Sequence, residues 1–245
     1  MTPAIEIKGL QKSYGPRPAL RGVDLSLAFG QALAIFGPNG SGKTTLIKVL
    51  ATLAQADGGT ARIAGLDLQQ SETALRRRIG VVTHQTYLYD DLTSYENLRF
   101  YGRLFSVPHL EARISEVAAL LGLEERMHQR VRTLSHGLQK RLSIARAVLH
   151  GPQVLLLDEP EAGLDPQAQE VLARLLAEHL HGGGAALITT HNVEQGLALG
   201  SHVAILAQGR VVYRQERPAV TEAEFDETYA RLTGASRQAR DEAAQ

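Results

Sequence analysis

The sequence predicts one α/β domain, in which buried strands form a sheet and helices cover it. An apolar run at residues 32–36 is followed by a glycine-rich loop at 37–45 and by a helical run at 46–50. Two further apolar runs, 154–157 and 186–190, have the length of buried strands and are followed directly by ionisable residues. At 245 residues the chain is long enough to bury a large core as a single domain.

The N-terminal part predicts half-buried strands. Residues 4–8 and 23–28 alternate apolar and polar side chains, which is typical of an antiparallel sheet with one face covered. A loop at Tyr14, Gly15 and Pro16 separates them, and Tyr14 either stacks on a base or closes an edge of the sheet. Further strands are predicted at 60–64 and 79–83, with a short helix at 71–78 between them.

Helical spacing then runs from Thr93 to His150. Thr93 and Glu96 predict a capping box, in which each side chain accepts a hydrogen bond from the backbone N–H of the other residue. Because this stretch interrupts the strands, we expect residues 93–149 to form a helical subdomain inserted into the sheet domain.

Strands and helices alternate in the last third of the chain. They are predicted at 154–159 (strand), 166–181 (helix), 185–190 (strand), 193–199 (helix), and 203–206 and 211–213 (a hairpin that turns at Gln208 and Gly209). Three glycines at 182–184 end the helix before them, because glycine tolerates the left-handed conformation. We expect residues 1–92 and 150–220 to form the sheet core with an antiparallel β subdomain, and 221–245 to form a C-terminal helix and a frayed tail.

Composition excludes several classes of protein. Lys plus Arg and Asp plus Glu number 26 each, so no overall positive field attracts nucleic acid, and without cysteine no disulfide framework forms. A membrane-spanning helix needs about 20 predominantly apolar residues, and the apolar runs here are much shorter. The N-terminus lacks a basic start followed by an apolar signal core, so we expect the protein in the cytoplasm.

The glycine-rich loop has the pattern G-x-x-x-x-G-K-[ST]. It comprises Gly37, Pro38, Asn39, Gly40, Ser41, Gly42, Lys43, Thr44 and Thr45. Between a strand and a helix, such glycines turn backbone N–H groups inward, and the helix start adds a partial positive charge. The pattern therefore predicts a triphosphate site, with Lys43 at the β- and γ-phosphates and Thr44 on Mg²⁺. The alternative is a glycine-rich turn that binds nothing.

Carboxylates and other polar groups follow the later strands. Asp158 and Glu159 end a buried strand, where open α/β sheets bind ligands, so Asp158 is a candidate to hold Mg²⁺ and Glu159 to orient or deprotonate an attacking water. The alternative for this pair is a helix cap. His191 and Gln85 also follow strands; His191 is a candidate to face the γ-phosphate and Gln85 to reach Mg²⁺ or the water.

A second candidate anion site lies at residues 134–141. Ser135, His136 and Gly137 stand at the start of an amphipathic helix, where a serine and a glycine favour anion binding.

In this order the motifs make the chain similar to the ATP-binding subunit of an ABC transporter over nearly its whole length. The resemblance implies a P-loop NTPase (RecA-like) core with an antiparallel β subdomain and an inserted α-helical subdomain. It further implies Tyr14 as the adenine-stacking residue, 37–45 as the Walker A motif, Gln85 as the Q-loop residue and Asp158 with Glu159 as Walker B.

The same resemblance implies the remaining site residues. Ser135, His136 and Gly137 belong to the signature motif, Asp165 to the D-loop at 163–165, and His191 is the switch histidine. ATP and Mg²⁺ are the implied cofactors, and Glu159, His191 and Gln85 the implied catalytic residues.

Two motifs depart from the family pattern. The usual signature reads Leu-Ser-Gly-Gly-Gln, whereas here His136 replaces the first glycine and Leu138 takes the glutamine position. Because Ser135 and Gly137 remain, we expect a working signature. Glu161 stands where the family often has an aromatic or small polar residue, and the sequence suggests no role for it.

The resemblance implies a transport motor at the cytoplasmic face of the cell membrane. Two ATP-binding subunits, as a homodimer or a heterodimer, would sandwich two ATP molecules and drive a transmembrane permease, with no nucleic acid partner. Residues 97–105 and 134–137 resemble multidrug-export and cytochrome c biogenesis (haem-export) cassettes, so we expect an exporter with haem as one candidate cargo.

Two other functions are disfavoured. Soluble ABC ATPases that act on DNA or ribosomes resemble two fused cassettes or a cassette split by a long coiled coil, and this chain has neither. An ATP-binding protein without turnover would not need Lys43, Asp158, Glu159 and His191 together.

Half of the twelve Phe and Tyr residues cluster in one short segment. They are Tyr87, Tyr89, Tyr95, Phe100, Tyr101 and Phe105. Tyr101 and Phe105 share an apolar helix face with Leu98 and suit the core. Tyr87, Tyr89 and Phe100 fit the core poorly, and we expect this surface to dock the permease.

Overall fold

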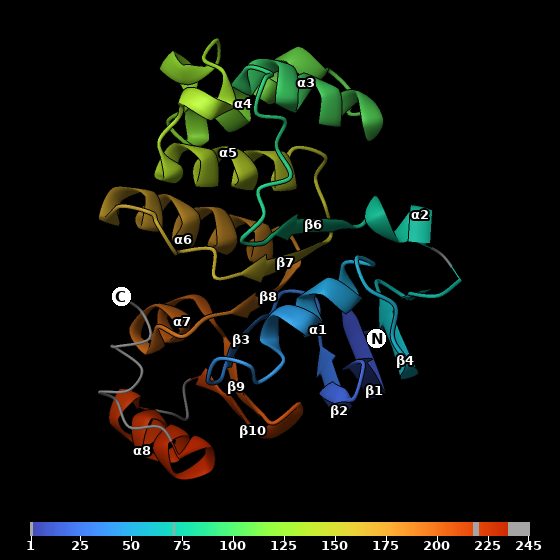
Figure 1. The fold of residues 1–245 in the computed structure, drawn as a ribbon. Helices are drawn as coiled ribbons and strands as arrows, with labels where there is room; N and C mark the ends of the chain where they lie inside the picture. Colours follow the sequence, from blue (N-terminus) through green and yellow to red (C-terminus); the bar gives the residue numbers. More distant parts are fainter. Residues whose placement is uncertain (1, 71, 218–220, 235–245) are drawn as a thin grey trace.

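A six-stranded sheet runs through the centre of the computed structural model, which describes residues 2–70, 72–217 and 221–234 (Figure 1). In spatial order its strands are β10 (Arg210–Glu216), β9 (His202–Ala207), β3 (Ala32–Phe36), β8 (Ala185–Thr189), β7 (Val154–Asp158) and β6 (Ile79–Val82). Strands β9 to β6 are parallel, and β10 pairs antiparallel with β9. β3, β7 and β8 are buried at every position, as parallel strands covered on both faces must be.

The second sheet is antiparallel and has four strands. Its order is β2 (Arg17–Leu27), β1 (Ile5–Tyr14), β4 (Gly58–Ile63) and β5 (Leu66–Asp67). β1 and β2 extend beyond the predicted 4–8 and 23–28, because they stay paired up to the turn at Gly15. A shift of register between Ile7 and Leu10 disturbs the alternation that the sequence pattern relies on.

Helix α1 (Lys43–Leu50) lies between the two sheets (Figure 1). Its Leu46 and Ile47 share one core cluster with Ile5 of β1 and with Leu33 and Ile35 of β3. The glycine-rich loop that leads into α1 is therefore anchored on both sides.

The predicted helical stretch forms three helices. They are α3 (Ser94–Leu104), α4 (Leu110–Leu120) and α5 (His136–Val148), with 3₁₀ turns η1 (Glu124–Arg126) and η2 (Val131–Thr133) between the last two. The capping box is confirmed, since Thr93 Oγ1 accepts from Glu96 N at 3.1 Å and Glu96 Oε2 accepts from Thr93 N at 2.8 Å. The helical stretch predicted to run to His150 is interrupted between these helices. Pro108, which has no backbone N–H, lies between α3 and α4, and Gly122 follows α4 with a φ of 63°.

These helices pack on the sheet through a second core cluster. Leu98, Val117 and Leu142 of the three helices share it with Leu157 of β7 and Leu172 of α6 (Pro166–His181). In Figure 1 this helical part lies above β6 and β7, with α5 next to α6.

The remaining helices are α2 (Glu72–Arg76), α7 (Val193–Leu199) and α8 (Glu222–Thr233). α6 and α7 begin and end where the sequence predicts. Of the three glycines after α6, Gly183 is left-handed with a φ of 82°, and Gly182 is the C-cap. The tail from residue 235, expected to fray, lies outside the described residues.

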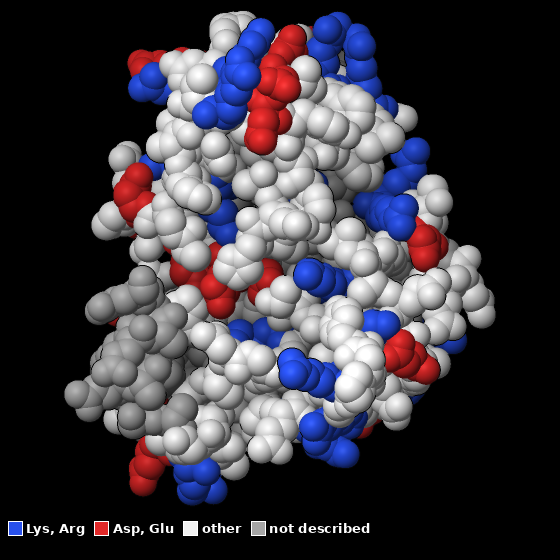
Figure 2. Space-filling view, viewed as in Figure 1, with Lys and Arg blue, Asp and Glu red and all other residues white. Residues whose placement is uncertain are grey.

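The described helices are too short to span a membrane, and the surface carries charges of both signs. None of the described helices is long and apolar enough to cross a membrane. On the face drawn in Figure 2, positive and negative side chains are interspersed, as the equal numbers of 26 acidic and 26 basic residues lead one to expect.

Candidate nucleotide-binding site

The loop between β3 and α1 has the tight backbone that a phosphate loop requires. A Cβ atom at Gly37 would collide with the carbonyl oxygen of Leu206 in β9. At Gly42, where φ is 109°, a Cβ would lie 2.5 Å from the carbonyl oxygen of Ala19. Side chains other than hydrogen are therefore excluded at both positions, and the backbone approaches its neighbours closely.

Lys43 begins α1, and its ammonium group lies inside this loop. Nζ donates to the carbonyl oxygens of Gly37 at 2.6 Å and Pro38 at 3.2 Å. Burial lowers the pKa of Lys43, and the nearby carboxylates of Glu159 and Asp158 oppose that shift. The loop thus combines a cationic side chain with the N-terminus of a helix, which is the chemistry of a phosphate site.

A cavity of about 490 Å³ opens over the loop. It is lined by Ala19, Asn39, Gly40, Ser41, Gly42, Lys43, Thr44, Thr45, His84, Glu159 and His191. Apart from Ala19 of β2, these residues come from the phosphate loop and from the segments that follow β6, β7 and β8. The carboxyl ends of parallel strands meet at one edge of the sheet, so residues far apart in the sequence converge here.

Glu159 lies between two imidazole groups. Its Oε1 is 3.2 Å from Nδ1 of His191, and its Oε2 is 3.4 Å from Nε2 of His84. The hydrogen bond with His191 lowers the pKa of Glu159 and raises that of His191, so each stabilises the charged form of the other. The backbone of Glu159 has a φ of 47°, an uncommon value for a residue with a side chain.

Asp158 has one carboxylate oxygen engaged and one without a partner. Oδ1 accepts from the Thr189 hydroxyl at 2.5 Å. Oδ2 is buried and makes no hydrogen bond to the part of the chain that the structure describes. Thr44 lines the cavity over the phosphate loop, whereas Asp158 does not. The hydroxyl of Thr44 and the Oδ2 atom of Asp158 are oxygens of the kind that a hard cation such as Mg²⁺ prefers.

The predicted signature residues lie away from this cavity. Ser135 caps α5, its Oγ accepting from Leu138 N at 3.4 Å, and His136 and Gly137 form the first turn of the helix. None of the three lines the cavity. A Cβ at Gly137 would come within 3.0 Å of the carbonyl oxygen of Gly163, so the signature adjoins the segment 163–165.

Asp165 joins that segment to the signature helix. It caps α6 by accepting from Ala168 N at 2.8 Å, and its other carboxylate oxygen is 2.5 Å from the Arg141 guanidinium in α5. Asp165 also lies outside the cavity over the phosphate loop.

Tyr14 and Gln85 are exposed and do not line the cavity either. Tyr14 stands at the turn between β1 and β2, with the Lys12 ammonium 5.5 Å from its ring centre.

Next to Gln85, His84 lines the cavity, and sequence reasoning missed it. The signal was present, because His84 is likewise an ionisable residue directly after a predicted strand.

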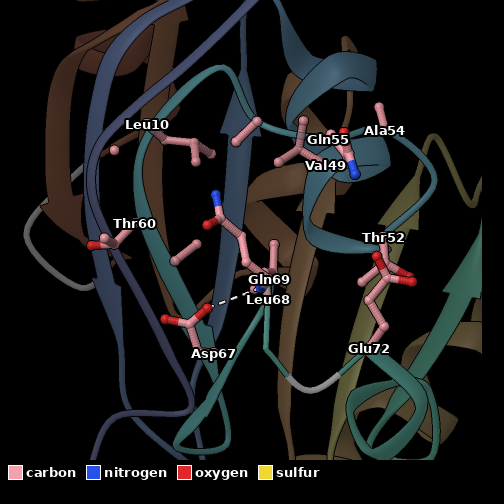
Figure 3. A pocket seen from close by; sticks show the side chains of 13 residues that line it. Leu10, Val49, Thr52, Ala54, Gln55, Thr60, Asp67, Leu68, Gln69 and Glu72 are labelled. Atoms are coloured by element: carbon pink, nitrogen blue, oxygen red, sulfur yellow. Dashed lines mark hydrogen bonds between the residues drawn. The ribbon is translucent and has the colours of Figure 1, made fainter.

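A second cavity, of about 330 Å³, lies between the antiparallel sheet and the far end of α1 (Figure 3). Its lining mixes apolar residues such as Leu10 and Val49 with polar ones such as Gln55, Asp67 and Gln69. It contains no residue of the phosphate loop or of the acidic pair. The two cavities are therefore separate.

Comparison with known proteins links this architecture to one family. The family model described as ABC transporter matches residues 20–162, more than half of the chain. The linearmycin resistance ATP-binding protein LnrL of Bacillus subtilis is 31% identical over 210 residues, which are 85% of this chain and 68% of that protein. The Nod factor export ATP-binding protein I of Cupriavidus metallidurans is 35% identical over 214 residues, 86% of this chain and 71% of that protein.

Solved structures agree with these relatives. An ATP-binding subunit of an ABC transporter matches with a TM-score of 0.83 and 26% identity, over 98% of this chain and 99% of the other. A dimeric, post-hydrolysis ATP-binding cassette with bound ADP and Pi matches with a TM-score of 0.81 and 26% identity, over 87% of this chain and 98% of the other. The fold class and the resemblance predicted from the sequence are both confirmed. The chain belongs to the ABC transporter family, in which it is an ATP-binding subunit with a P-loop NTPase fold and ATPase activity.

Proposed function

We propose that the chain is the motor of an ABC exporter, and that two ATP-binding subunits close around two ATP–Mg²⁺ to drive a transmembrane permease. The observation that carries this proposal is the separation of the signature from the phosphate-loop cavity within one chain. One copy lines the cavity with the phosphate loop and Glu159, but with none of its own signature residues. The signature of a second subunit, Ser135 to Gly137, would complete it.

Different residues of the site bind the phosphates, hold the metal and activate the attacking water. Lys43 and the backbone of 39–45 hold the phosphates, while Thr44 and the free oxygen of Asp158 suit Mg²⁺, with Gln85 as a further candidate ligand. Bound Mg²⁺ would neutralise charge on the phosphates. Glu159 orients the attacking water and takes its proton, and His191 keeps the Glu159 carboxylate ionised and in place. For Tyr14 we propose adenine stacking, and for Asp165 a place at the boundary between the two copies.

The relatives support a direction of transport. The similar proteins described above are named for Nod factor export and for linearmycin resistance, which favours an exporter of small organic compounds. Haem is the second candidate cargo, favoured by the similarity of residues 97–105 and 134–137 to haem-export cassettes. We place the chain at the cytoplasmic face of the cell membrane, bound to the permease.

The substitution Glu159→Gln tests the motor. The amide neither takes the proton nor carries the charge, whereas Lys43 and Thr44 still hold the phosphates, so ATP should bind and remain unhydrolysed. We expect the variant to form a dimer in gel filtration when ATP is added. A variant that a binding assay shows to be loaded with ATP, but that elutes only as a monomer, would contradict the two-subunit site.

A further inference from the structure

Glu161, two residues beyond Glu159, is a buried carboxylate. Only 6% of its surface is exposed. One oxygen, Oε1, accepts a hydrogen bond from the Thr190 hydroxyl, and the other, Oε2, is buried with no hydrogen-bond partner among the described residues. Burial raises the pKa of Glu161. A carboxyl group in this position costs stability, because it loses hydration that its single hydrogen bond does not replace.

The partner of Glu161 stands next to the switch histidine. Besides donating to Glu161, the Thr190 hydroxyl accepts from the backbone N–H of Asn192 at 3.0 Å. The hydroxyl of Thr190, the residue before His191, thus holds the backbone of Asn192, the residue after it. Glu161 orients this hydroxyl by accepting its hydrogen bond. His191 in turn has its Nδ1 3.2 Å from Oε1 of Glu159.

A buried lysine of the signature helix α5 contacts the backbone of Glu159. Lys140, 8% exposed, donates from Nζ to the backbone oxygen of Glu159 at 2.9 Å. Burial lowers the pKa of Lys140, and the negative charge of Glu161 is the foremost of the charges that oppose this. Lys140 therefore holds the backbone of Glu159, whose φ of 47° is uncommon, from the side of the signature helix.

We propose that Glu161 is a positioning residue for ATP hydrolysis, which fixes His191 against Glu159 through the Thr190 hydroxyl. It does not line the nucleotide cavity, so it acts only through its neighbours. This inference rests on the roles proposed above for Glu159 and His191. It also assigns a role to Glu161, which stands where the family often has an aromatic or small polar residue.

Two substitutions at Glu161 separate its hydrogen bond from its volume. Glu161→Gln keeps an oxygen that accepts from Thr190, and we expect a kcat within about threefold of the wild type. Glu161→Leu keeps a similar volume but removes both oxygens, and we expect kcat to fall about tenfold. The KM for ATP should stay within about twofold in both variants, because the phosphate loop is untouched.

Thermal stability distinguishes positioning from packing. Since leucine replaces a poorly satisfied buried carboxyl group, the Tm of Glu161→Leu should equal or exceed that of the wild type. If Glu161 served only the packing of the core, Tm would fall while kcat of the folded protein stayed unchanged. That result would overturn the proposal.

Thr190 tests the same link from its other end. Thr190→Val removes the hydroxyl at nearly constant volume and should lower kcat about tenfold, as Glu161→Leu does. Thr190→Ser keeps the hydroxyl and should keep kcat close to that of the wild type. In the double variant Glu161→Leu/Thr190→Val the loss should remain about tenfold, because both changes remove one interaction. A loss of about a hundredfold would mean independent effects and would overturn the link.

Two controls complete the experiment. Val117→Ala removes buried apolar surface in α4, far from the cavity, and should lower Tm while leaving kcat unchanged. Glu159→Gln, measured in parallel, separates the two proposals. If it is inactive while Glu161→Leu has full kcat, only the role of Glu161 fails; if Glu159→Gln still hydrolyses ATP, the proposed motor chemistry itself fails.

Discussion

The carboxylate of Glu159 has an imidazole group on each side, and the two histidines come from different strands. His191 follows β8 and His84 follows β6, so strand order places them on opposite sides of a residue that follows β7. Each imidazole engages a different oxygen. The orientation of the carboxylate therefore depends on both, although the sequence pattern singled out only one.

Replacing His84 tests its contribution. In His84→Ala the carboxylate loses one of its two imidazole contacts. Because an ion pair with a largely exposed partner contributes at most about 1 kcal/mol, we expect kcat to fall by no more than about fivefold. His84→Gln keeps a donor at similar reach and should recover most of the loss. Steady-state ATPase assays at saturating ATP measure both variants, and wild-type kcat in His84→Ala would show that the contact contributes nothing to hydrolysis.

His136 replaces the first glycine of the common signature. It is exposed in the first turn of α5 and does not line the cavity of its own chain. We expect His136→Gly, which restores the common signature, to keep activity within about tenfold, equivalent to about 1.4 kcal/mol of barrier. If the folded variant lost ATPase activity by several orders of magnitude, His136 would have to contact the phosphates of the opposite subunit.

Among the elements, the helical insertion is joined to the edge of the sheet by a partly buried histidine. His150, just after α5, stacks on Phe105 after α3 with ring centres 4.1 Å apart. Its Nε2 is 3.0 Å from the backbone oxygen of Ile79 in β6, and its Nδ1 is buried without a partner among the described residues. Burial lowers the pKa of His150 to about 4, so the ring is neutral in the folded protein at neutral pH.

This lowered pKa predicts how stability depends on pH. An unfolded histidine titrates near 6.5, so between about pH 6.5 and pH 4 the unfolded chain binds the proton and the folded chain does not. The contribution of His150 is therefore fully present above about pH 6.5 and is lost as the pH falls towards 4, with an upper limit of about 3 kcal/mol. Denaturant unfolding of the wild type and of His150→Gln at several pH values measures the difference. Parallel curves for the two proteins would contradict the assignment.

On the molecule as a whole, one surface presents aromatic side chains to solvent. Tyr89 is 49% exposed and Phe100 is 42% exposed, and their rings meet edge to face with centres 5.1 Å apart. A groove of about 450 Å³ beside them is lined by Glu96, Arg99, Phe100, Arg103 and Leu104. Tyr87 differs, because it is only partly exposed, and its backbone oxygen accepts from the Tyr101 hydroxyl. Tyr89, rather than Tyr87, pairs with Phe100 on this surface.

We expect this surface to dock the permease. The double substitution Tyr89→Ala/Phe100→Ala should weaken co-purification with the membrane subunit and leave ATP binding to the isolated chain nearly unchanged, since neither residue lines the nucleotide cavity. Phe29→Ala, which removes another exposed aromatic residue, serves as the matched control. Full retention of the membrane subunit by the double variant would rule out docking at this surface.

Local patterns determined the elements themselves. The phosphate loop between β3 and α1, the capping box at Thr93, the bounds of α6 and the hairpin at Gly209 are all visible in the sequence, because each depends on residues within a few positions of one another. Runs of apolar residues were sufficient for the buried strands. The breaks between α3, α4 and α5 were missed because the apolar spacing continues across them, although Pro108 and Gly122 mark them in the sequence.

Contacts between distant segments were decided only by the tertiary structure. The pairing of Glu161 with Thr190, the approach of His84 to Glu159 and the distance of Ser135 from the phosphate loop all depend on which strands are neighbours, and the order β10-β9-β3-β8-β7-β6 is not the order of the chain. Sequence reasoning identified residues that follow strands, as at Gln85 and His191. It did not show which side chain of such a turn faces the cavity, because that depends on backbone torsion angles and on packing against segments that are distant in the chain, as the contact of His84 with Glu159 illustrates.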